Sequence, residues 1–282
     1  MSTREQILSK VREMPSLPLT ATRVLQLVQE PDTPFSVLQR EVELDATLAS
    51  NVLRLANSAY FAGSGPIASV RDAIVRMGTK RLLQLVLTTS VAPLTSQPLR
   101  GYGLRAGGLL RHCAATAIGA EQLSQELHLN APDYTYTAGL LHDIGKVVLG
   151  TYLEVDATPI LELAYQEGLS FEIAEQRILG VDHTEVGATL LEAWMIPASV
   201  VDAVRWHHSP DAYPGPERLV VDLIHVADHI ARVSGTSADA DGLNYALSAQ
   251  AVERIRMKPT TTETVVSSVL RSLDEICENL SQ

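Results

Sequence analysis

Near its middle, the chain reads Gly139-Leu140-Leu141-His142-Asp143-Ile144-Gly145-Lys146. The apolar residues around the His142-Asp143 pair predict a buried helix. Both groups can bind a metal, and their apolar neighbours offer them few other partners. Because burying such groups unpaired costs several kcal/mol, this stretch indicates a helical interior built around a polar site.

Outside this stretch, the hydrophobic periodicity is helical along nearly the whole chain. After Asp45, which we expect to cap a helix, Leu48, Val52 and Leu55 recur at the i, i+4, i+7 spacing. A C-terminal helix over residues 260–280 places four apolar side chains on one face: Val265, Val269, Leu273 and Ile276. Alternation with period two, which is typical of half-buried strands, is not sustained anywhere. The sequence therefore predicts an all-α fold.

The composition is that of a globular protein and excludes several classes of function. Of 282 residues, 46% are hydrophobic and 20% are charged, and the net charge is −11. That charge argues against nucleic-acid binding, which needs a concentrated basic face. Two cysteines, Cys113 and Cys277, cannot build a four-thiolate metal site and suit a reducing cytoplasm. No apolar stretch approaches the roughly 20 residues of a membrane span, and we find no signal-peptide pattern, so we expect a soluble, cytoplasmic protein.

A boundary between two helical lobes is predicted at residues 93–108. This segment holds four glycines and two prolines, which favour irregular backbone. We expect an N-terminal lobe over residues 1–100 and a second lobe over residues 101–282. Within the first lobe, Gly78 separates two predicted helices, as in a helix-turn-helix motif. Two ordinary core helices are the alternative interpretation.

All eight histidines lie between residues 112 and 229. His207-His208 is a second pair of adjacent residues that can bind a metal, and a metal would bind both rings in their neutral form. His112 lies in a largely apolar helix. Asp228 lies in an apolar stretch with no Lys or Arg between Arg218 and Arg232. His225 precedes Asp228 by three residues, so we expect it at most to support the site from outside.

These residues, in this order, resemble the HD superfamily of metal-dependent phosphohydrolases. The closer resemblance is to its HDOD branch, the HD-related output domains of bacterial signalling proteins. The segments that carry it are Met14-Pro15-Ser16-Leu17-Pro18, Asp45 with Leu53-Arg54-Leu55-Ala56-Asn57-Ser58-Ala59, Ser69-Val70 with Ala73-Ile74 and Gly78, residues 139–146, His183-Thr184-Glu185-Val186-Gly187-Ala188, Trp194-Met195-Ile196-Pro197 and His207-His208. Together they cover almost the whole chain. The resemblance implies a two-lobed helical protein with an HD-like core.

The resemblance also implies a set of metal ligands. These are His112, His142, Asp143, His183, His207, His208 and Asp228. Asp143 would bridge two divalent ions, one held with His112, His142 and Asp228, the other with His183, His207 and His208. Mixed histidine and carboxylate ligands suit iron, manganese, zinc or nickel better than calcium.

Catalytic roles for Asp143 and Lys146 follow from the same resemblance. Two bridged ions would generate a hydroxide, and Lys146 would neutralise phosphate charge. A solvated lysine at a helix end is the equally weighted alternative for Lys146. The Gly-Tyr-Pro signature of the branch that cleaves cyclic dinucleotides is replaced by Ala212-Tyr213-Pro214, and Gly108 cannot supply a carboxylate to a third metal. Both departures argue against that reaction.

Three functions remain open at this point. We prefer a signalling output module that presents a surface to a separate signalling protein and whose metal site is structural or vestigial. The second hypothesis is a metal-dependent phosphohydrolase with a nucleotide or another phosphoester as its ligand. The third, a DNA-binding protein that uses residues 69–91, is disfavoured by the net charge.

Overall fold

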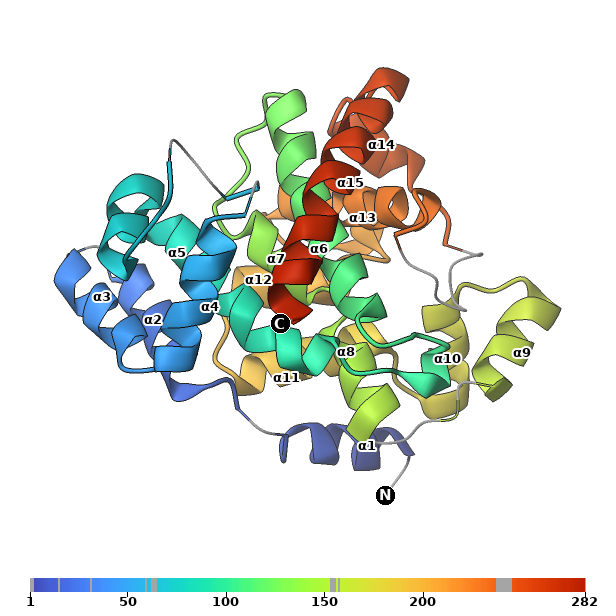
Figure 1. Ribbon diagram of the computed structural model, residues 1–282. Coiled ribbons are helices and arrows are strands. Elements are labelled where there is room, and N and C mark those ends of the chain that lie inside the picture. Colours follow the sequence, from blue (N-terminus) through green and yellow to red (C-terminus); the bar gives the residue numbers. More distant parts are fainter. Residues whose placement is uncertain are drawn as a thin grey trace. The chain divides into compact units, whose positions relative to one another are not determined.

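The computed structural model describes residues 3–14, 16–30, 32–58, 60–61, 65–152, 156, 158–236 and 245–281. Within these ranges the chain is helical and forms no strand, apart from one isolated β-bridge between Leu99 and Leu104 (Figure 1). The predicted all-α class is therefore confirmed. Pro15 and Ala59, which belong to two of the motifs above, lie outside the described residues.

Contacts divide the chain into two compact units. Unit 1 comprises Met1–Met14 and Thr95–Leu270, and unit 2 comprises Pro15–Leu94 and Arg271–Gln282. The division into lobes at residue 100 stays a prediction. Across the described ranges, every helix is too short or too polar to cross a membrane.

In the described part of the chain, unit 2 is built on α2 (Leu19–Gln29), α3 (Phe35–Glu43), α4 (Ala46–Ala56), α5 (Val70–Thr95) as far as Leu94, and the end of α15 (Pro259–Ser281) from Arg271. Asp45 caps α4 as predicted, because its side chain accepts a hydrogen bond of 2.9 Å from the backbone N–H of Leu48. The predicted break at Gly78 is also present, with φ 81° and ψ 170° inside α5. Asn57 exchanges two hydrogen bonds with the backbone of Ile67, which fixes the chain after α4.

Unit 1 holds the remaining α-helices of the described residues. These are α1 (Thr3–Val11), α6 (Gly108–Glu126), α7 (Thr135–Leu141), α8 (Ile144–Val147), α9 (Thr158–Glu167), α10 (Phe171–Leu179), α11 (His183–Ala193), α12 (Ala198–Trp206), α13 (Arg218–Val233), α14 (Ala249–Arg254) and α15 (Pro259–Ser281) as far as Leu270. Helix α6 packs against α7 and α13, and α8 packs against α11. The four residues of the predicted apolar face of α15 are buried, as expected.

Two glycines allow the close helix packing at the centre of unit 1. A Cβ atom on Gly139 would lie 2.7 Å from Cα of Ala117, which real Cβ atoms essentially never do, so only glycine lets α7 lie this close to α6. A Cβ atom on Gly145 would overlap the backbone oxygen of His183 at the start of α11. These glycines flank the His142-Asp143 pair and bring it against α6 and α11.

The sequence predicts one helix that contains this pair, and this prediction is wrong because the helix is interrupted there. Helix α7 ends at Leu141 and α8 begins at Ile144. His142 keeps helical angles, but Asp143 has φ −101° and ψ 12°, which lies outside the helical range. The break lets His142 and Asp143 extend from two different helix ends into the same interior.

Candidate metal centre

The seven residues predicted as metal ligands meet in the interior of unit 1. They come from α6, the α7–α8 junction, α11, the end of α12 and α13. All are buried except His208, whose side chain is still only 4% exposed. They form two groups whose ligand atoms lie close together: His112, His142 and Asp228, and Asp143, His183, His207 and His208. His128 and His229 belong to neither group.

Asp143 lies between the two groups and directs one oxygen to each. Its Oδ2 lies 3.5 Å from Nε2 of His112 and 3.4 Å from Nε2 of His142. Its Oδ1 lies 3.3 Å from Nε2 of His183 and 3.8 Å from Nε2 of His207. This is the arrangement that a carboxylate needs in order to bridge two cations.

Asp228 completes the first group. Its Oδ1 lies 2.9 Å from Nε2 of His112 and 3.5 Å from Nε2 of His142. The same oxygen accepts a hydrogen bond of 2.9 Å from Nε of Arg232, one helical turn further along α13. Arg232 is thus the side chain whose positive charge compensates this buried carboxylate when no metal is bound.

Three of the histidines are oriented by hydrogen bonds on their other ring nitrogen. Nδ1 of His142 donates to the backbone oxygen of Gly139 (2.8 Å), and Nδ1 of His207 donates to that of Val204 (2.7 Å). Nδ1 of His183 lies 2.6 Å from the carboxylate of Glu175. When such a ring is neutral, the proton on Nδ1 leaves Nε2 with a free lone pair, as in most histidines that bind metals.

The polar atoms of the cluster are not satisfied by the protein alone. The Nε2 atoms of His183 and His208 lie 3.1 Å apart, a distance that accommodates one shared proton or a cation. Nε2 of His207 and Oδ1 of Asp143 are buried without a hydrogen-bond partner among the described residues. Such groups cost about 1–3 kcal/mol each. A divalent ion would satisfy them, so the donor set fits a metal.

Four of the groups already have the protonation state that binds metal: His207, His208, Asp143 and Asp228. Burial lowers the pKa of His207 and of His208 well below the ordinary value, so both rings are neutral at neutral pH. Burial by itself would raise the pKa of Asp143, but the charges of Lys146 and His142, together with the contacts to His142 and His183, outweigh burial and hold that pKa well below the usual range. Burial would also raise the pKa of Asp228, but the charge of Arg232 and the contacts with His112 and His142 together hold it well below the usual range.

Lys146 is buried inside the cluster, so the interpretation as a solvated lysine is wrong. Its Nζ donates a hydrogen bond of 2.8 Å to Oδ2 of Asp143. A catalytic role for Lys146 or Asp143 stays a prediction.

The structure adds residues that the sequence analysis missed. Glu175 is buried and accepts hydrogen bonds from the His183 backbone N–H (2.9 Å) and from the Tyr102 hydroxyl (2.7 Å). Arg232 could have been found, because it follows Asp228 at the i+4 spacing. His225 supports the cluster from outside, because its Nδ1 donates to the backbone oxygen of His207 (2.7 Å).

Comparison with known proteins gives both a family match and similar structures. The HDOD domain family matches residues 14–210. An HDOD domain protein of unknown function from Geobacter sulfurreducens is 23% identical, with a TM-score of 0.76 over 99% of this chain and 98% of that chain. A provisionally assigned phosphohydrolase from Shewanella amazonensis SB2B is 24% identical, with a TM-score of 0.74 over 97% of both chains. Both share the fold.

A curated relative extends beyond the matched region. An uncharacterized protein of Treponema pallidum (strain Nichols) is 22% identical over 232 residues, which is 80% of this chain and 44% of that protein. The chain therefore spans less than half of the length of this relative.

Proposed function

The chain belongs to the HDOD family, and from this premise we propose that it is a signal-transduction output module with a dinuclear metal centre. One observation carries the proposal: the two oxygens of Asp143 face two different groups of histidines. Each group combines imidazole with carboxylate, which favours iron, manganese, zinc or nickel. The partner of such a module is another signalling protein.

The burial of the cluster favours a structural role for the metal. The ligands come from five separate segments of unit 1, so bound ions would hold these segments together. Six of the seven ligands are buried and the seventh is nearly so, so bound ions would lie inside the helical packing of unit 1. Metal binding would therefore stabilise the surfaces that unit 1 offers to a partner.

The test is the metal content of the purified chain by elemental analysis. We expect two transition-metal ions per chain in the wild type and none in the His142→Ala, Asp143→Ala double variant. The control is His128→Ala, which removes an exposed histidine outside both groups and should leave the content unchanged. One ion or none in the wild type, purified without chelators, would contradict a dinuclear centre.

A second candidate function is a metal-dependent phosphohydrolase. The observation that favours it is the buried Lys146, whose ammonium group lies within the cluster. Bound ions would supply an activated hydroxide, and Lys146 would hold the negative charge of a phosphoester. The provisional assignment of the Shewanella amazonensis relative agrees with this alternative.

Hydrolysis of bis(p-nitrophenyl) phosphate by the metal-loaded chain separates the two candidates. The phosphohydrolase proposal expects turnover that is lost in Lys146→Met and kept in Lys10→Met, an exposed lysine on α1. Full metal loading without any turnover would leave the output module as the function.

A further inference from the structure

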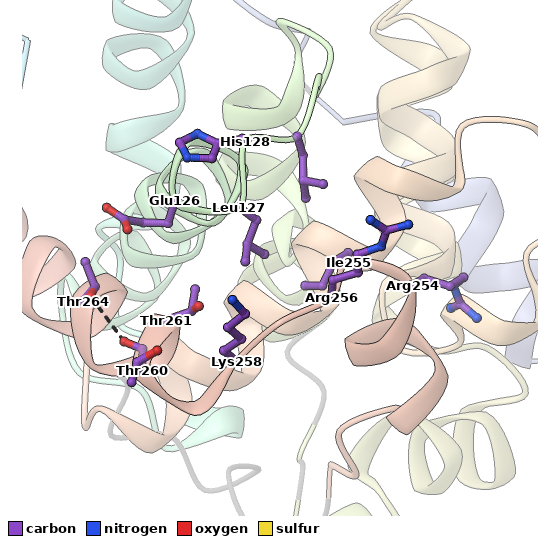
Figure 2. Close-up of a pocket in the computed structure, with 11 residues that line it drawn as sticks. Glu126, Leu127, His128, Arg254, Ile255, Arg256, Lys258, Thr260, Thr261 and Thr264 are labelled. Carbon is purple, nitrogen blue, oxygen red and sulfur yellow. Dashed lines mark hydrogen bonds between the residues drawn. The ribbon is translucent and has the colours of Figure 1, made fainter.

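Unit 1 contains a second polar feature, a cavity of about 700 Å³ (Figure 2). It is lined by residues 126–129 at the end of α6, residues 254–256 at the end of α14, and residues within 258–264 at the start of α15. None of the predicted metal ligands lines it. The proposed function therefore leaves this cavity unexplained.

The cavity carries positive charge in a chain with a net charge of −11. Arg256 and Lys258 line it, and neither side chain forms a hydrogen bond or an ion pair with the described part of the chain. Arg254 is different, because it pairs with Asp211 (2.8 Å) and Asp222 (2.6 Å). Two cations are thus left for a ligand. The ammonium group of Lys258 extends toward Leu127 (Figure 2).

The start of α15 adds the positive end of a helix and a threonine hydroxyl to these charges. This helix runs for 23 residues and has no acidic residue in its first turn, so its positive end is not neutralised from within that turn. Thr261 lines the cavity and is only 8% exposed. Its hydroxyl forms no hydrogen bond with the residues that the structure describes. An unpartnered hydroxyl on a buried residue, at a helix N-terminus beside two cations, indicates an anionic ligand.

Part of the wall is apolar and is formed by Leu127, Leu129 and Ile255, while His128, Thr260 and Thr264 add further polar groups. One carboxylate, that of Glu126, also lines the cavity, and it points away from Lys258 (Figure 2). The volume lies in the range of about 300–1,000 Å³ that is usual for small-molecule sites. A ligand with one anionic end and an organic body matches both walls.

We propose that this cavity binds a small phosphate monoester. The phosphate contacts Arg256, Lys258 and the start of α15, and the organic part lies against the apolar wall. A phosphate group forms strong hydrogen bonds with cationic side chains and also binds at helix N-termini. The proposal does not depend on the metal centre, because it uses different residues.

The test is calorimetric titration of the full chain with three probes: adenosine monophosphate, inorganic phosphate and adenosine. We expect the nucleotide to bind most tightly, inorganic phosphate more weakly and adenosine not measurably. Lys258→Gln should weaken nucleotide binding by about tenfold or more, and Thr261→Val by a smaller factor. The control is Lys10→Gln, which makes the same change of charge on α1 and should bind as the wild type does.

Four results would overturn the proposal. They are no saturable nucleotide binding, equal binding of adenosine and the nucleotide, nucleotide binding no tighter than inorganic phosphate, and equal effects of Lys258→Gln and Lys10→Gln. Binding that is lost in the His142→Ala, Asp143→Ala variant but kept in Lys258→Gln would also overturn it, because the phosphate would then lie at the metal centre. Circular dichroism of each variant shows whether it is folded.

Discussion

The carboxylate of Glu175 lies 2.6 Å from Nδ1 of His183, and both side chains are completely buried. Glu175 also accepts hydrogen bonds from the backbone N–H of His183 and from Tyr102. These contacts hold the ring so that its Nε2 faces Asp143. Glu175 is therefore a positioning residue for one half of the proposed metal centre.

Removing this carboxylate should weaken metal binding without removing a ligand. We expect Glu175→Ala to reduce metal affinity by about 10–100-fold, as is usual for a residue that orients a metal-bound histidine. Glu175→Gln keeps an acceptor oxygen, so its metal affinity should fall by a smaller factor. Competition with a colorimetric chelator measures both affinities.

The matched control is Glu162→Ala on α9, which removes an exposed carboxylate. Its affinity should equal that of the wild type. If Glu175→Ala bound metal as tightly as this control, a positioning role for Glu175 would be excluded.

Metal affinity should rise with pH through the neutral range. Burial lowers the pKa of His183, but the charge of Glu175 and the contact with Asp143 outweigh burial and raise this pKa to about 10. Below that pH the metal-free ring carries a proton that a metal must displace. Binding therefore releases a proton, and the affinity should increase by about tenfold for each pH unit up to about pH 10.

Chelator competition at pH 6, 7 and 8 measures this slope. The pKa of His142 is also raised, by Asp143 against the effect of burial, so the release of a second proton would make the slope steeper. Glu175→Ala should flatten it, because that variant loses the carboxylate that favours the charged ring. An affinity that did not change with pH would contradict the assigned protonation states.

Arg232 should contribute more to the stability of the metal-free chain than to that of the metal-bound chain. Its Nε donates to Asp228, and both side chains are 4% exposed. Arg232→Met leaves a buried carboxylate uncompensated, which typically costs about 3–5 kcal/mol in the free energy of unfolding. A bound cation would compensate Asp228 instead, so added metal should recover part of the loss.

Urea unfolding with and without metal checks this difference. Arg177→Met is the control, because it breaks the exposed ion pair with Glu167 and should cost no more than about 1 kcal/mol. Equal losses in the Arg232 variant with and without metal would argue against metal binding at Asp228.

The helical class could be predicted because it leaves local patterns, and so could part of the candidate site, whereas the full ligand set, His183 included, was implied by the family resemblance. Apolar spacing predicts α4 and α15, and His142-Asp143 and His207-His208 are recognisable as adjacent pairs. The position of Glu175 could not be predicted, since it lies in α10, whose pattern is that of an ordinary amphipathic helix. Its role arises only when packing brings α10 to the start of α11. The cavity at α15 was missed for the same reason, because its residues come from three separate segments.

The break in the helix at Asp143 could not be predicted from apolar periodicity. A substitution at Gly145 tests whether the packing of α8 against α11 positions Asp143. The missing Cβ atom of Gly145 lets α8 lie against the backbone of His183. Gly145→Ala must therefore separate α8 from α11 and move Asp143 relative to His183. We expect a loss of about 3 kcal/mol or more in the free energy of unfolding, the upper end of ordinary overpacking, together with weaker metal binding.

Gly168→Ala is the matched comparison for the backbone effect of the same substitution. Gly168 has a φ of +64°, and no atom lies within 4 Å of the point that a Cβ atom there would occupy, so alanine strains the backbone without a collision. That variant should lose only about 1–2 kcal/mol and bind metal normally. Urea unfolding and chelator competition on both variants separate the two effects. Similar losses of stability with normal metal binding in both would show that the contact between α8 and α11 does not position Asp143.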